Sequence, residues 1–596
     1  MKIFWKQFSY LLDREDKKRF CFFIFLLFIG GLLSLLGIGA VIPFVKVLVS
    51  PDKINYLSVL GGLTYVHAVG LCVVVLILSF WIKDMASILI LKWQTVFLNN
   101  LMAKIRKKLF SCYIYSPYIY QARRSSSDLI NNINIESQFL SGYVMAQVGN
   151  VLNEVVTSFV VFIALVFINP VFSIIVVGCL LLTAKLFMSW LKERSDYYGK
   201  LRAKSYADLT RSVAQGLGGV KETKIYQKEA YFVAEVDAAA DKIAKSASFA
   251  AVFSQTPRFL IEAVAIAVVL ITLFCFVLVG YTGTALLVLL SIFGVAAVQL
   301  LPSMNRLMQA LTMMRYGYPA LDKIYHEIKK IDAEKVEKVQ YQAGDMLQFK
   351  KTISLSNISF SYLTNPVLNN IDLVVRRGEK VAFVGTSGAG KTTLVDVILG
   401  VLQPGQGEIY VDDVQITKNN LGAWQRNFGY IPQMIYIYDC SLRENIAFGL
   451  DAENIDDERV WYCLDQAALS NFVREECEQG LDTLVGENGV RLSGGQRQRI
   501  GIARALYYDP NILVMDEATA ALDNQTEYEV TQALSNVGKD RTIITIAHRL
   551  TTIQNYDTIF VMDQGKVIDS GNYEHLLDKC SVFKKMVEIS QRKEGV

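Results

Sequence analysis

The sequence is poor in charged residues. Asp, Glu, Lys and Arg together make up only 19% of its 596 residues, whereas apolar residues make up 52%. A soluble protein of this length usually carries more charge, so the composition indicates segments that cross a membrane. The net charge of +4 is too small to argue for a nucleic-acid partner. At this length we expect about three or four domain-sized pieces.

The sequence also lacks any ordered pattern of cysteines. Nine are present, but none forms a CxxC pair or has the spacing of a metal site. Several lie inside apolar runs: Cys21, Cys72, Cys179 and Cys275. They are typical of small buried side chains in a reducing or lipid environment rather than of disulfides. We expect no cleavable signal peptide, because the first apolar run is long and no A-x-A site follows it.

Six long apolar runs lie in the first 330 residues. A helix crosses the hydrocarbon core of a membrane with about 20 residues, and each run is close to that length. The runs are Phe20–Leu48, Val66–Leu91, Phe139–Ile168, Val171–Leu191, Phe259–Val279 and Ala285–Leu301. The sequence therefore predicts an all-α transmembrane domain of six helices over residues 19–330.

Charged segments separate some of these runs and set the predicted domain boundaries. Residues 1–18 mix apolar and charged residues as in an amphipathic helix on the membrane surface, although an ordinary start to the first span fits them equally well. Two polar excursions, with turns near 116–132 and 216–228, leave the membrane and return. We expect a linker at 331–350 and an α/β domain at 351–596.

Basic residues are concentrated beside the second and fourth runs. The residues are Lys104, Arg106, Lys107, Lys108, Arg123 and Arg124 after the second, and Lys192, Arg194, Lys200, Arg202, Lys204 and Arg211 after the fourth. The loops on the opposite side contain almost none. The positive-inside rule therefore predicts that both termini and both excursions lie in the cytoplasm.

A glycine-rich segment at 385–393 has the pattern of a phosphate-binding loop. It follows an apolar run, 381–384, that indicates a buried strand, and it precedes a second run that indicates a helix. Backbone N–H groups and the helix start favour an anion there. Lys391 can reach terminal phosphates, and the Thr392 hydroxyl can ligate Mg²⁺. The loop residues are Gly385, Thr386, Ser387, Gly388, Ala389, Gly390, Lys391, Thr392 and Thr393.

Two further patterns in this half fit nucleotide chemistry. A predicted strand at 512–515 ends in Asp516 and Glu517. Asp516 is expected to hold Mg²⁺ through water, and Glu517 to polarise the water that attacks the terminal phosphate. The segment 492–496 precedes a helical stretch and predicts a second anion site. Because one nucleotide seldom needs two such sites, we expect the second to cap a nucleotide held by another copy.

These motifs, in this order, resemble the nucleotide-binding domain of ABC transporters over residues 350–590. In that resemblance residues 385–393 are the Walker A loop, 492–496 the family signature, and Asp516 with Glu517 the Walker B motif and its catalytic glutamate. Tyr362 matches the adenine-stacking position, Gln433 the Q-loop and Glu487 the X-loop of exporters. Asp523 belongs to the D-loop, where Ala520 replaces the commoner serine, and His548 matches the switch histidine.

The resemblance implies the cofactors ATP and Mg²⁺ and a role for each site residue. Two copies would sandwich two ATP molecules, each between Lys391 of one copy and the signature residues Ser493, Gly495 and Gln496 of the other. Gln433 would ligate Mg²⁺, and His548 would contact the γ-phosphate. The chain thus resembles a half-transporter that pairs with itself, or with a relative, in the bacterial inner membrane.

Charged residues inside the predicted spans point to the substrate. Ionisable side chains are costly there, so Lys83, Arg258 and Arg306 are candidates for a substrate cavity. All three are expected near the inner leaflet, where they would suit an anionic headgroup such as pyrophosphate. The alternatives are snorkelling to the interface and, for Lys83, pairing with Asp84.

Short segments of the membrane half resemble the PglK family of lipid-linked oligosaccharide flippases. They are 256–258 with Glu262, 301–306 and 42–44, and in the ATPase half 429–438. This resemblance implies a polyprenyl-pyrophosphate oligosaccharide as the lipid-linked substrate. An exporter of drugs, lipid A or peptides is the alternative, and an ATP-gated channel or regulator is an alternative of another class.

Overall fold

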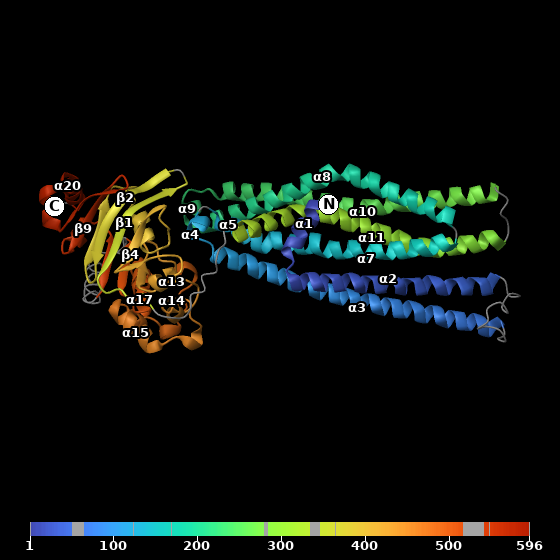
Figure 1. Cartoon of the computed structure of the whole chain (residues 1–596), viewed down its shortest axis with the longest axis horizontal. Coiled ribbons are helices and arrows are strands. Elements are labelled where there is room, and N and C mark those ends of the chain that lie inside the picture. The colour runs from blue at the N-terminus through green and yellow to red at the C-terminus, as the bar shows by residue number, and fades with distance from the viewer. Residues whose placement is uncertain are drawn as a thin grey trace. The chain divides into compact units, whose positions relative to one another are not determined.

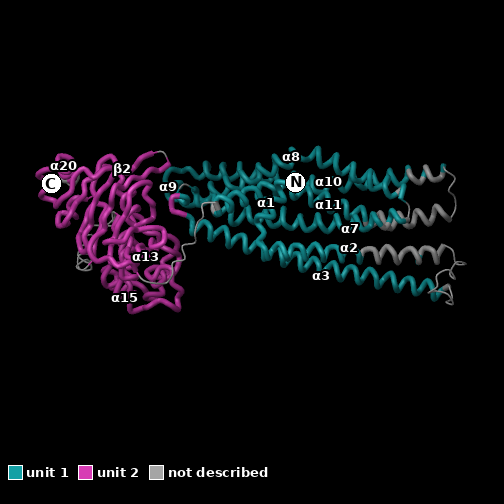
Figure 2. Tube along the Cα trace, viewed as in Figure 1, with its two compact units in different colours: residues 1–116, 120–336 teal, residues 117–119, 337–596 magenta. Residues whose placement is uncertain are grey.

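The structure is a computed structural model that describes residues 2–49, 65–122, 124–168, 170–278, 284–333, 346–363, 365–516, 541–547 and 549–594. It divides into two units, residues 1–116 with 120–336 and residues 117–119 with 337–596, as Figure 2 shows. The described part of the first unit is helical, and the second combines helices with two sheets.

Long helices build the first unit (Figure 1). α2 packs on α3 and α7, α8 packs on α10, and α11 packs on α7, α8 and α10. The long helices are α2 (Arg14–Val49), α3 (Tyr65–Ile114), α7 (Ala146–Ile168), α8 (Pro170–Gly218), α10 (Glu229–Leu278) and α11 (Thr284–Ala333). Shorter helices are α1 (Lys2–Leu11), α4 (Tyr118–Ala122), α5 (Ser126–Asn131), α6 (Ser137–Phe139) and α9 (Val220–Ile225), with π-helical segments η2 (Asn132–Glu136) and η3 (Leu140–Met145).

Four helical stretches among the described residues are long and apolar enough to cross a membrane. They are Val66–Ile114, Ser126–Phe167, Ser173–Gly218 and Glu229–Ile271. α3 exposes large apolar side chains such as Trp81 and Leu89, and such a surface is stable only against lipid or a partner. The first and sixth predicted spans rest largely on side chains outside the described residues, so they and the domain boundaries stay predictions.

The amphipathic helix α1 uses its apolar face inside the first unit. Phe4, Phe8 and Leu11 are buried in a cluster with apolar side chains of α3 and α11. The Gln7 Nε2 donates a hydrogen bond to Asp322 Oδ1 at 2.6 Å. Because its apolar side packs on α3 and α11, α1 is held against the helical bundle by protein contacts. Its predicted position on the membrane surface stays a prediction.

A fully buried ion pair joins η2 to α8. The Arg202 Nη2 lies 3.2 Å from Glu136 Oε2, and neither side chain is exposed to solvent (0% for both). The Arg202 guanidinium also lies 3.8 Å from the centre of the Phe139 ring. Gly199 lets α8 approach α11, since a Cβ there would lie 2.7 Å from the Tyr316 carbonyl oxygen. Burial of both charges makes this contact sensitive to loss of one partner.

We expect Arg202→Ala to destabilise the protein by about 3–5 kcal/mol, because it leaves the Glu136 carboxylate buried without its cation. The double replacement Arg202→Leu with Glu136→Leu should lose much less, since it removes both charges. The measurement is thermal unfolding of the purified full chain in detergent. The control is Arg194→Ala on the same helix, whose guanidinium lies over Trp190. An equal effect of all three variants would contradict this account.

Two sheets form the second unit (Figure 1). The four-stranded sheet has the order β2-β1-β4-β5, and the six-stranded sheet has the order β10-β9-β3-β8-β7-β6. The first sheet contains β1 (Thr352–Tyr362), β2 (Asn365–Arg376), β4 (Gln406–Val411) and β5 (Val414–Gln415). The second contains β3 (Lys380–Gly385), β6 (Phe428–Ile431), β7 (Ile512–Asp516), β8 (Thr542–Ile546), β9 (Thr558–Asp563) and β10 (Lys566–Gly571).

The six-stranded sheet is parallel except at one edge. β3 pairs in parallel with β8 and β9, and β7 with β6 and β8, while β10 runs antiparallel to β9. β7 and β8 are almost wholly buried, as expected for strands that are covered on both faces. Gln564 and Gly565 both have positive φ angles (45° and 76°), which suits the tight turn between β9 and β10.

Helices of the second unit belong to different hydrophobic clusters. α12 (Lys391–Ile398) packs with β1, β2 and β3, whereas α14 (Leu442–Ile446), α15 (Asp457–Gln466) and α17 (Gly494–Tyr507) pack in a second cluster with β6 and β7. α19 (Tyr573–Lys579) and α20 (Ser581–Glu594) form a third with β9. The remaining helices are α13 (Leu421–Gln425) and α16 (Ser470–Glu475).

Candidate nucleotide site

The strand order of the six-stranded sheet puts several sequence motifs at the carboxyl ends of neighbouring strands. β3, β8, β7 and β6 are consecutive neighbours, and Phe383, Ile546 and Asp516 lie in one row across three of them. Parallel neighbours lie about 4.8 Å apart, so the end of β7 is only about 10 Å from the end of β3. The phosphate loop, Asp516 and the segment after β6 therefore share the carboxyl edge of one sheet.

The phosphate loop connects β3 to α12 in a conformation that only glycine accommodates easily. Gly388 and Gly390 have φ angles of 81° and 96°, which lie in the left-handed region. A Cβ on Gly385 would lie 2.2 Å from the Met562 carbonyl oxygen, so β9 leaves no room for a side chain. Gly390 is the N-cap of α12, whose first-turn N–H groups face the loop and favour an anion.

Lys391 begins α12 and lies almost buried beneath the loop. Its Nζ donates to the carbonyl oxygens of Gly385 at 2.9 Å and Thr386 at 3.1 Å. The ammonium is thus held inside the loop, where it can neutralise phosphate charge. On the flank of the loop, Thr386, Ser387 and Arg549 line a cavity of about 520 Å³ that extends to side chains of α20.

Carboxylates on β7 and α12 create a negative potential beside the loop. Burial raises the pKa of Asp396 to about 6, and the charge of Asp516 adds to this effect. A divalent cation near Thr392, in the first turn of α12, would relieve that repulsion. No cluster of three or more His, Cys, Asp or Glu that could hold a metal ion occurs among the described residues, but Mg²⁺ in phosphate sites needs only one or two carboxylates with substrate phosphates. The residues present therefore fit Mg²⁺.

The remaining site residues of the sheet side lie at strand ends. Tyr362 ends β1, is half-buried, and packs edge-on against Phe360 with ring centres 4.9 Å apart. Gln433 follows β6 by two residues and is exposed. The contacts of both residues with a nucleotide stay predictions.

The signature segment forms a separate helix start. Ser493 is the N-cap of α17, and its Oγ accepts the Gln496 N–H at 3.1 Å. The Gln496 Oε1 in turn accepts the Ser493 N–H at 2.7 Å. This capping box fixes the helix start and leaves the N–H groups of Gly494 and Gly495 directed outward. Ser493 is exposed, so an anion can approach it from outside the unit.

The structure does not test several of the predicted site residues. Glu517, Asp523 and His548 lie outside the described residues, so their roles stay predictions. Glu487 is exposed in a short 3₁₀ segment, η6 (Glu487–Gly489). The signature residues lie on α17, in a different hydrophobic cluster from α12.

The three candidate cations of the substrate cavity all have carboxylate neighbours. Lys83 lies 3.5 Å from Asp84, and Arg258 lies 2.9 Å from Glu262. The sequence predicted the Lys83–Asp84 pair as an alternative, but the analysis of charged residues in the spans missed Glu154. It is 4% exposed and lies 2.6 Å from the Arg306 Nε. The available signal was its position as a single carboxylate inside the apolar run that became α7.

Ser303 completes the polar cluster around Glu154. Its hydroxyl donates to Glu154 Oε2 and lies 3.1 Å from the Ser158 hydroxyl. The Arg306 Nη2 also donates to Glu154 Oε2 at 3.2 Å. The guanidinium of Arg306 is therefore held by two hydrogen bonds to one carboxylate, although the side chain is 57% exposed.

We expect Gly385→Ala to weaken ATP binding by about tenfold or more, because the added Cβ must displace the loop or β9. The measurement is nucleotide affinity of the purified full chain by titration. The matched control is Gly405→Ala, where a Cβ would make only an ordinary contact at 3.5 Å to the Ser359 carbonyl oxygen. Unchanged affinity in Gly385→Ala would show that the loop does not need this close approach.

Comparison with known proteins agrees with this geometry. The family model described as ABC transporter matches residues 368–520, and that of the ABC transporter transmembrane region matches residues 20–302. The heterocyst differentiation ATP-binding protein HepA of Nostoc sp. is 31% identical over 496 residues, which cover 80% of this chain and 77% of HepA. The ATP-dependent lipid A-core flippase of Saccharophagus degradans is 30% identical over 488 residues, 81% of each chain.

Two further matches cover nearly the whole chain. The ATP-dependent lipid A-core flippase of Bordetella avium is 27% identical over 573 residues, 95% of this chain and 94% of its own. A bacterial Atm1-family ABC exporter solved with ATP bound superposes with a TM-score of 0.77 at 22% identity, over 98% of this chain and 99% of that one. The predicted fold class, a helical transmembrane domain with an α/β ATPase domain, is confirmed. The chain belongs to the ABC transporter family, and it is a multi-pass membrane exporter that binds and hydrolyses ATP.

Proposed function

We propose that the protein is a flippase that uses ATP to move a polyprenyl-pyrophosphate-linked oligosaccharide from the cytoplasmic to the outer leaflet of a bacterial inner membrane. The relatives named lipid A-core flippase support a lipid substrate. The pyrophosphate of such a carrier is a compact anion, and guanidinium groups bind phosphate oxygens in pairs. A pyrophosphate substrate therefore requires an arginine of the first unit whose guanidinium can still donate hydrogen bonds to it.

The proposal rests mainly on the hydrogen bonding and exposure of Arg258 on α10. Its Nε donates to Glu262 Oε1 at 2.9 Å, and the side chain is 66% exposed. Within the described part of the chain, its two Nη groups make no hydrogen bond. Glu262, one helical turn away, thus orients the guanidinium while its fork stays available. Such an arrangement suits bidentate capture of a phosphate group.

Arg306 and Lys83 contribute less under this proposal. Glu154 takes two hydrogen bonds from Arg306, so the pair carries little net charge. The Asp84 carboxylate likewise offsets the charge of Lys83, since its Oδ1 lies 3.5 Å from the Lys83 Nζ. Arg306 can still act, because an anion that competes for its Nη groups would leave Glu154 bonded to Ser303. We therefore rank Arg258 first, Arg306 second and Lys83 third as substrate contacts.

ATP would drive the movement through a pair of chains. The two anion-binding helix starts of one chain, at α12 and α17, belong to different hydrophobic clusters, which favours two half-sites over one. Lys391 of one copy and Ser493 of its partner would hold each ATP. A homodimer uses the chain alone, and a heterodimer with a relative is the alternative.

The proposed site residues divide the work of hydrolysis. Thr392, Gln433 and Asp516 would hold Mg²⁺, which when bound neutralises charge on the β- and γ-phosphates. Glu517 would orient and deprotonate the attacking water, and His548 would contact the γ-phosphate. Closing the two copies around ATP would switch the helices between inward-open and outward-open forms.

Two alternatives remain as outcomes of the same experiments. An exporter of drugs, lipid A or peptides would use the same ATPase and would not depend on Arg258 for a pyrophosphate. An ATP-gated channel or regulator would not couple each turnover to movement of a lipid. Reconstitution in vesicles with each candidate substrate separates these three functions.

We expect Glu517→Gln to bind ATP with near-normal affinity and to lower the turnover number by about 100-fold or more, because the amide cannot accept the proton of the attacking water. The measurement is phosphate release and nucleotide affinity on the same preparation. Hydrolysis close to that of the unmodified protein would remove Glu517 from the role of base.

We expect Arg258→Ala to lower vesicle transport of a polyprenyl-pyrophosphate oligosaccharide by about tenfold or more, through loss of charge-assisted hydrogen bonds. Basal ATP hydrolysis should change less than twofold, because the nucleotide site is unaltered. Transport and hydrolysis are measured in the same vesicles.

The matched control is Lys245→Ala, which removes a cation from an exposed position of α10. It lies 13 residues before Arg258, about 20 Å along the helix, and should leave transport intact. Equal loss of transport and basal hydrolysis in Arg258→Ala would instead indicate a folding or coupling defect. Normal transport would exclude Arg258 from the substrate path.

A further inference from the structure

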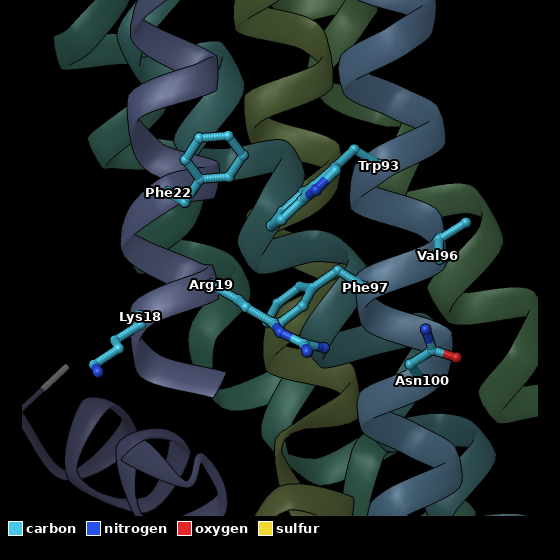
Figure 3. Close-up of a pocket in the computed structure, with 7 residues that line it drawn as sticks. All are labelled: Lys18, Arg19, Phe22, Trp93, Val96, Phe97 and Asn100. Carbon is cyan, nitrogen blue, oxygen red and sulfur yellow. The ribbon is translucent and has the colours of Figure 1, made fainter. Parts of the chain in front are cut away.

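Residues of α2 and α3 line a cavity of about 410 Å³, and Figure 3 shows their side chains. Its volume is within the range of small-molecule sites, about 300–1,000 Å³. The lining residues are Lys18, Arg19, Phe22, Trp93, Val96, Phe97 and Asn100. The lining therefore combines two cations, an amide and aromatic rings, and it contains no carboxylate.

The two cations of this cavity have no carboxylate partner among the described residues. Lys18 and Arg19 are exposed, and neither makes an ion pair or hydrogen bond within the described part of the chain. The nearby carboxylates of Asp13 and Asp16 are each 2.8 Å from Lys104 instead. Glu15, one turn before Arg19, forms no ion pair among the described residues. Among the described residues, no ion pair therefore neutralises the positive charge at the cavity.

Aromatic rings form a rigid wall behind these cations. Trp93 stacks on Phe23 and on Phe97, with ring centres 5.7 Å and 5.3 Å apart and planes within 14° of parallel. Phe22 meets the same indole edge-on at 5.6 Å. In Figure 3, Arg19 and Phe97 project into the space between α2 and α3, with Asn100 beyond them on α3. Trp in this setting is typical of the boundary between hydrocarbon and headgroups.

The surface beside the cavity changes from charged to apolar along both helices. On α2, residues 14–19 are polar, whereas Phe22, Phe25 and Phe28 beyond them are exposed aromatic side chains. On α3, Leu89 and Val96 are likewise exposed. The positive-inside orientation predicted from the sequence puts this boundary on the cytoplasmic side. An acyl chain can lie along the apolar strip while its headgroup reaches Lys18 and Arg19.

We propose that this cavity binds the phosphate headgroup of an anionic glycerophospholipid of the cytoplasmic leaflet. Lys18 and Arg19 pair with the phosphate, Asn100 donates a hydrogen bond to the headgroup, and the acyl chains follow Phe22 and Val96. Charge complementarity selects an anionic headgroup over a zwitterionic one. The bound lipid fixes the junction of α1 and α2 against α3. This site is independent of Arg258 and of the transported substrate.

The test uses the full chain in lipid nanodiscs that contain phosphatidylcholine with a small fraction of phosphatidylglycerol. Lipid retained by the protein is counted by native mass spectrometry, and its affinity is obtained by titration of the phosphatidylglycerol fraction. The variant Lys18→Gln with Arg19→Gln should bind phosphatidylglycerol about thirty-fold more weakly, because each cation near a membrane surface contributes about fivefold.

The matched control is Arg14→Gln with Lys17→Gln, which removes the same charge from the same end of α2 without altering the cavity lining. It should retain the affinity within about twofold. Should the first variant fail to fold, Asn100→Asp supplies a second test, since a carboxylate in the cavity repels phosphate. Thermal unfolding of each variant reports its folding.

Three outcomes would overturn the proposal. Equal loss in both double variants would indicate diffuse attraction to the membrane surface. Equal retention of phosphatidylcholine would exclude selection by charge. Displacement of phosphatidylglycerol by a polyprenyl-pyrophosphate lipid, with loss of transport in the Lys18 and Arg19 variant, would assign the cavity to the substrate path. Normal transport with weakened phosphatidylglycerol binding supports a separate lipid site.

Discussion

Parallel pairing of β3 with β8, and of β8 with β7, is the constraint on which the nucleotide site depends. It puts the loop after β3 and the carboxylate that ends β7 on the same edge of a sheet, although they are far apart in the chain. The close approach of β9 then forces a glycine at position 385. This strand order brings the loop that contains Lys391 and the Asp516 carboxylate to the same end of the sheet.

Local patterns in the sequence predicted the parts of this site but not their pairing. The spacing of glycines around Lys391 needs no knowledge of distant residues, because the loop and its helix are contiguous. The capping box of Ser493 and Gln496 is local in the same way. The pairing of β3 with β8 and the ion pair of Arg306 with Glu154 join residues more than 100 positions apart, so no periodicity reveals them. Sequence reasoning therefore identified Arg306 as a cation and missed the carboxylate that holds it.

Neutralisation of charge within the helical unit is a common theme of its polar contacts. Arg202 has Glu136, Arg306 has Glu154, and Arg258 has Glu262. Burial explains the first pair, since an isolated charge there would be costly. The third is exposed and leaves donors available, which is what a transient ligand requires. Lys18 and Arg19 stand at the other extreme, because no described carboxylate compensates them. Cations with a buried carboxylate partner thus serve the fold, whereas cations without one, or with free donors, are candidates for ligand binding.

The two π-helical segments, η2 and η3, have a consequence for the phase of the helix in which they lie. Each wide turn accommodates extra backbone relative to an α-helix, and one residue corresponds to a rotation of about 100°. Deleting a single residue within η2 would convert the wide turn to an α-helical one and keep the phase of the helix on either side, whereas a deletion in the α-helical residues of α5 would rotate Glu136 by about 100° relative to the start of that helix. The wide turns are therefore the positions where this helix can lose a residue and still keep Glu136 in register with Arg202.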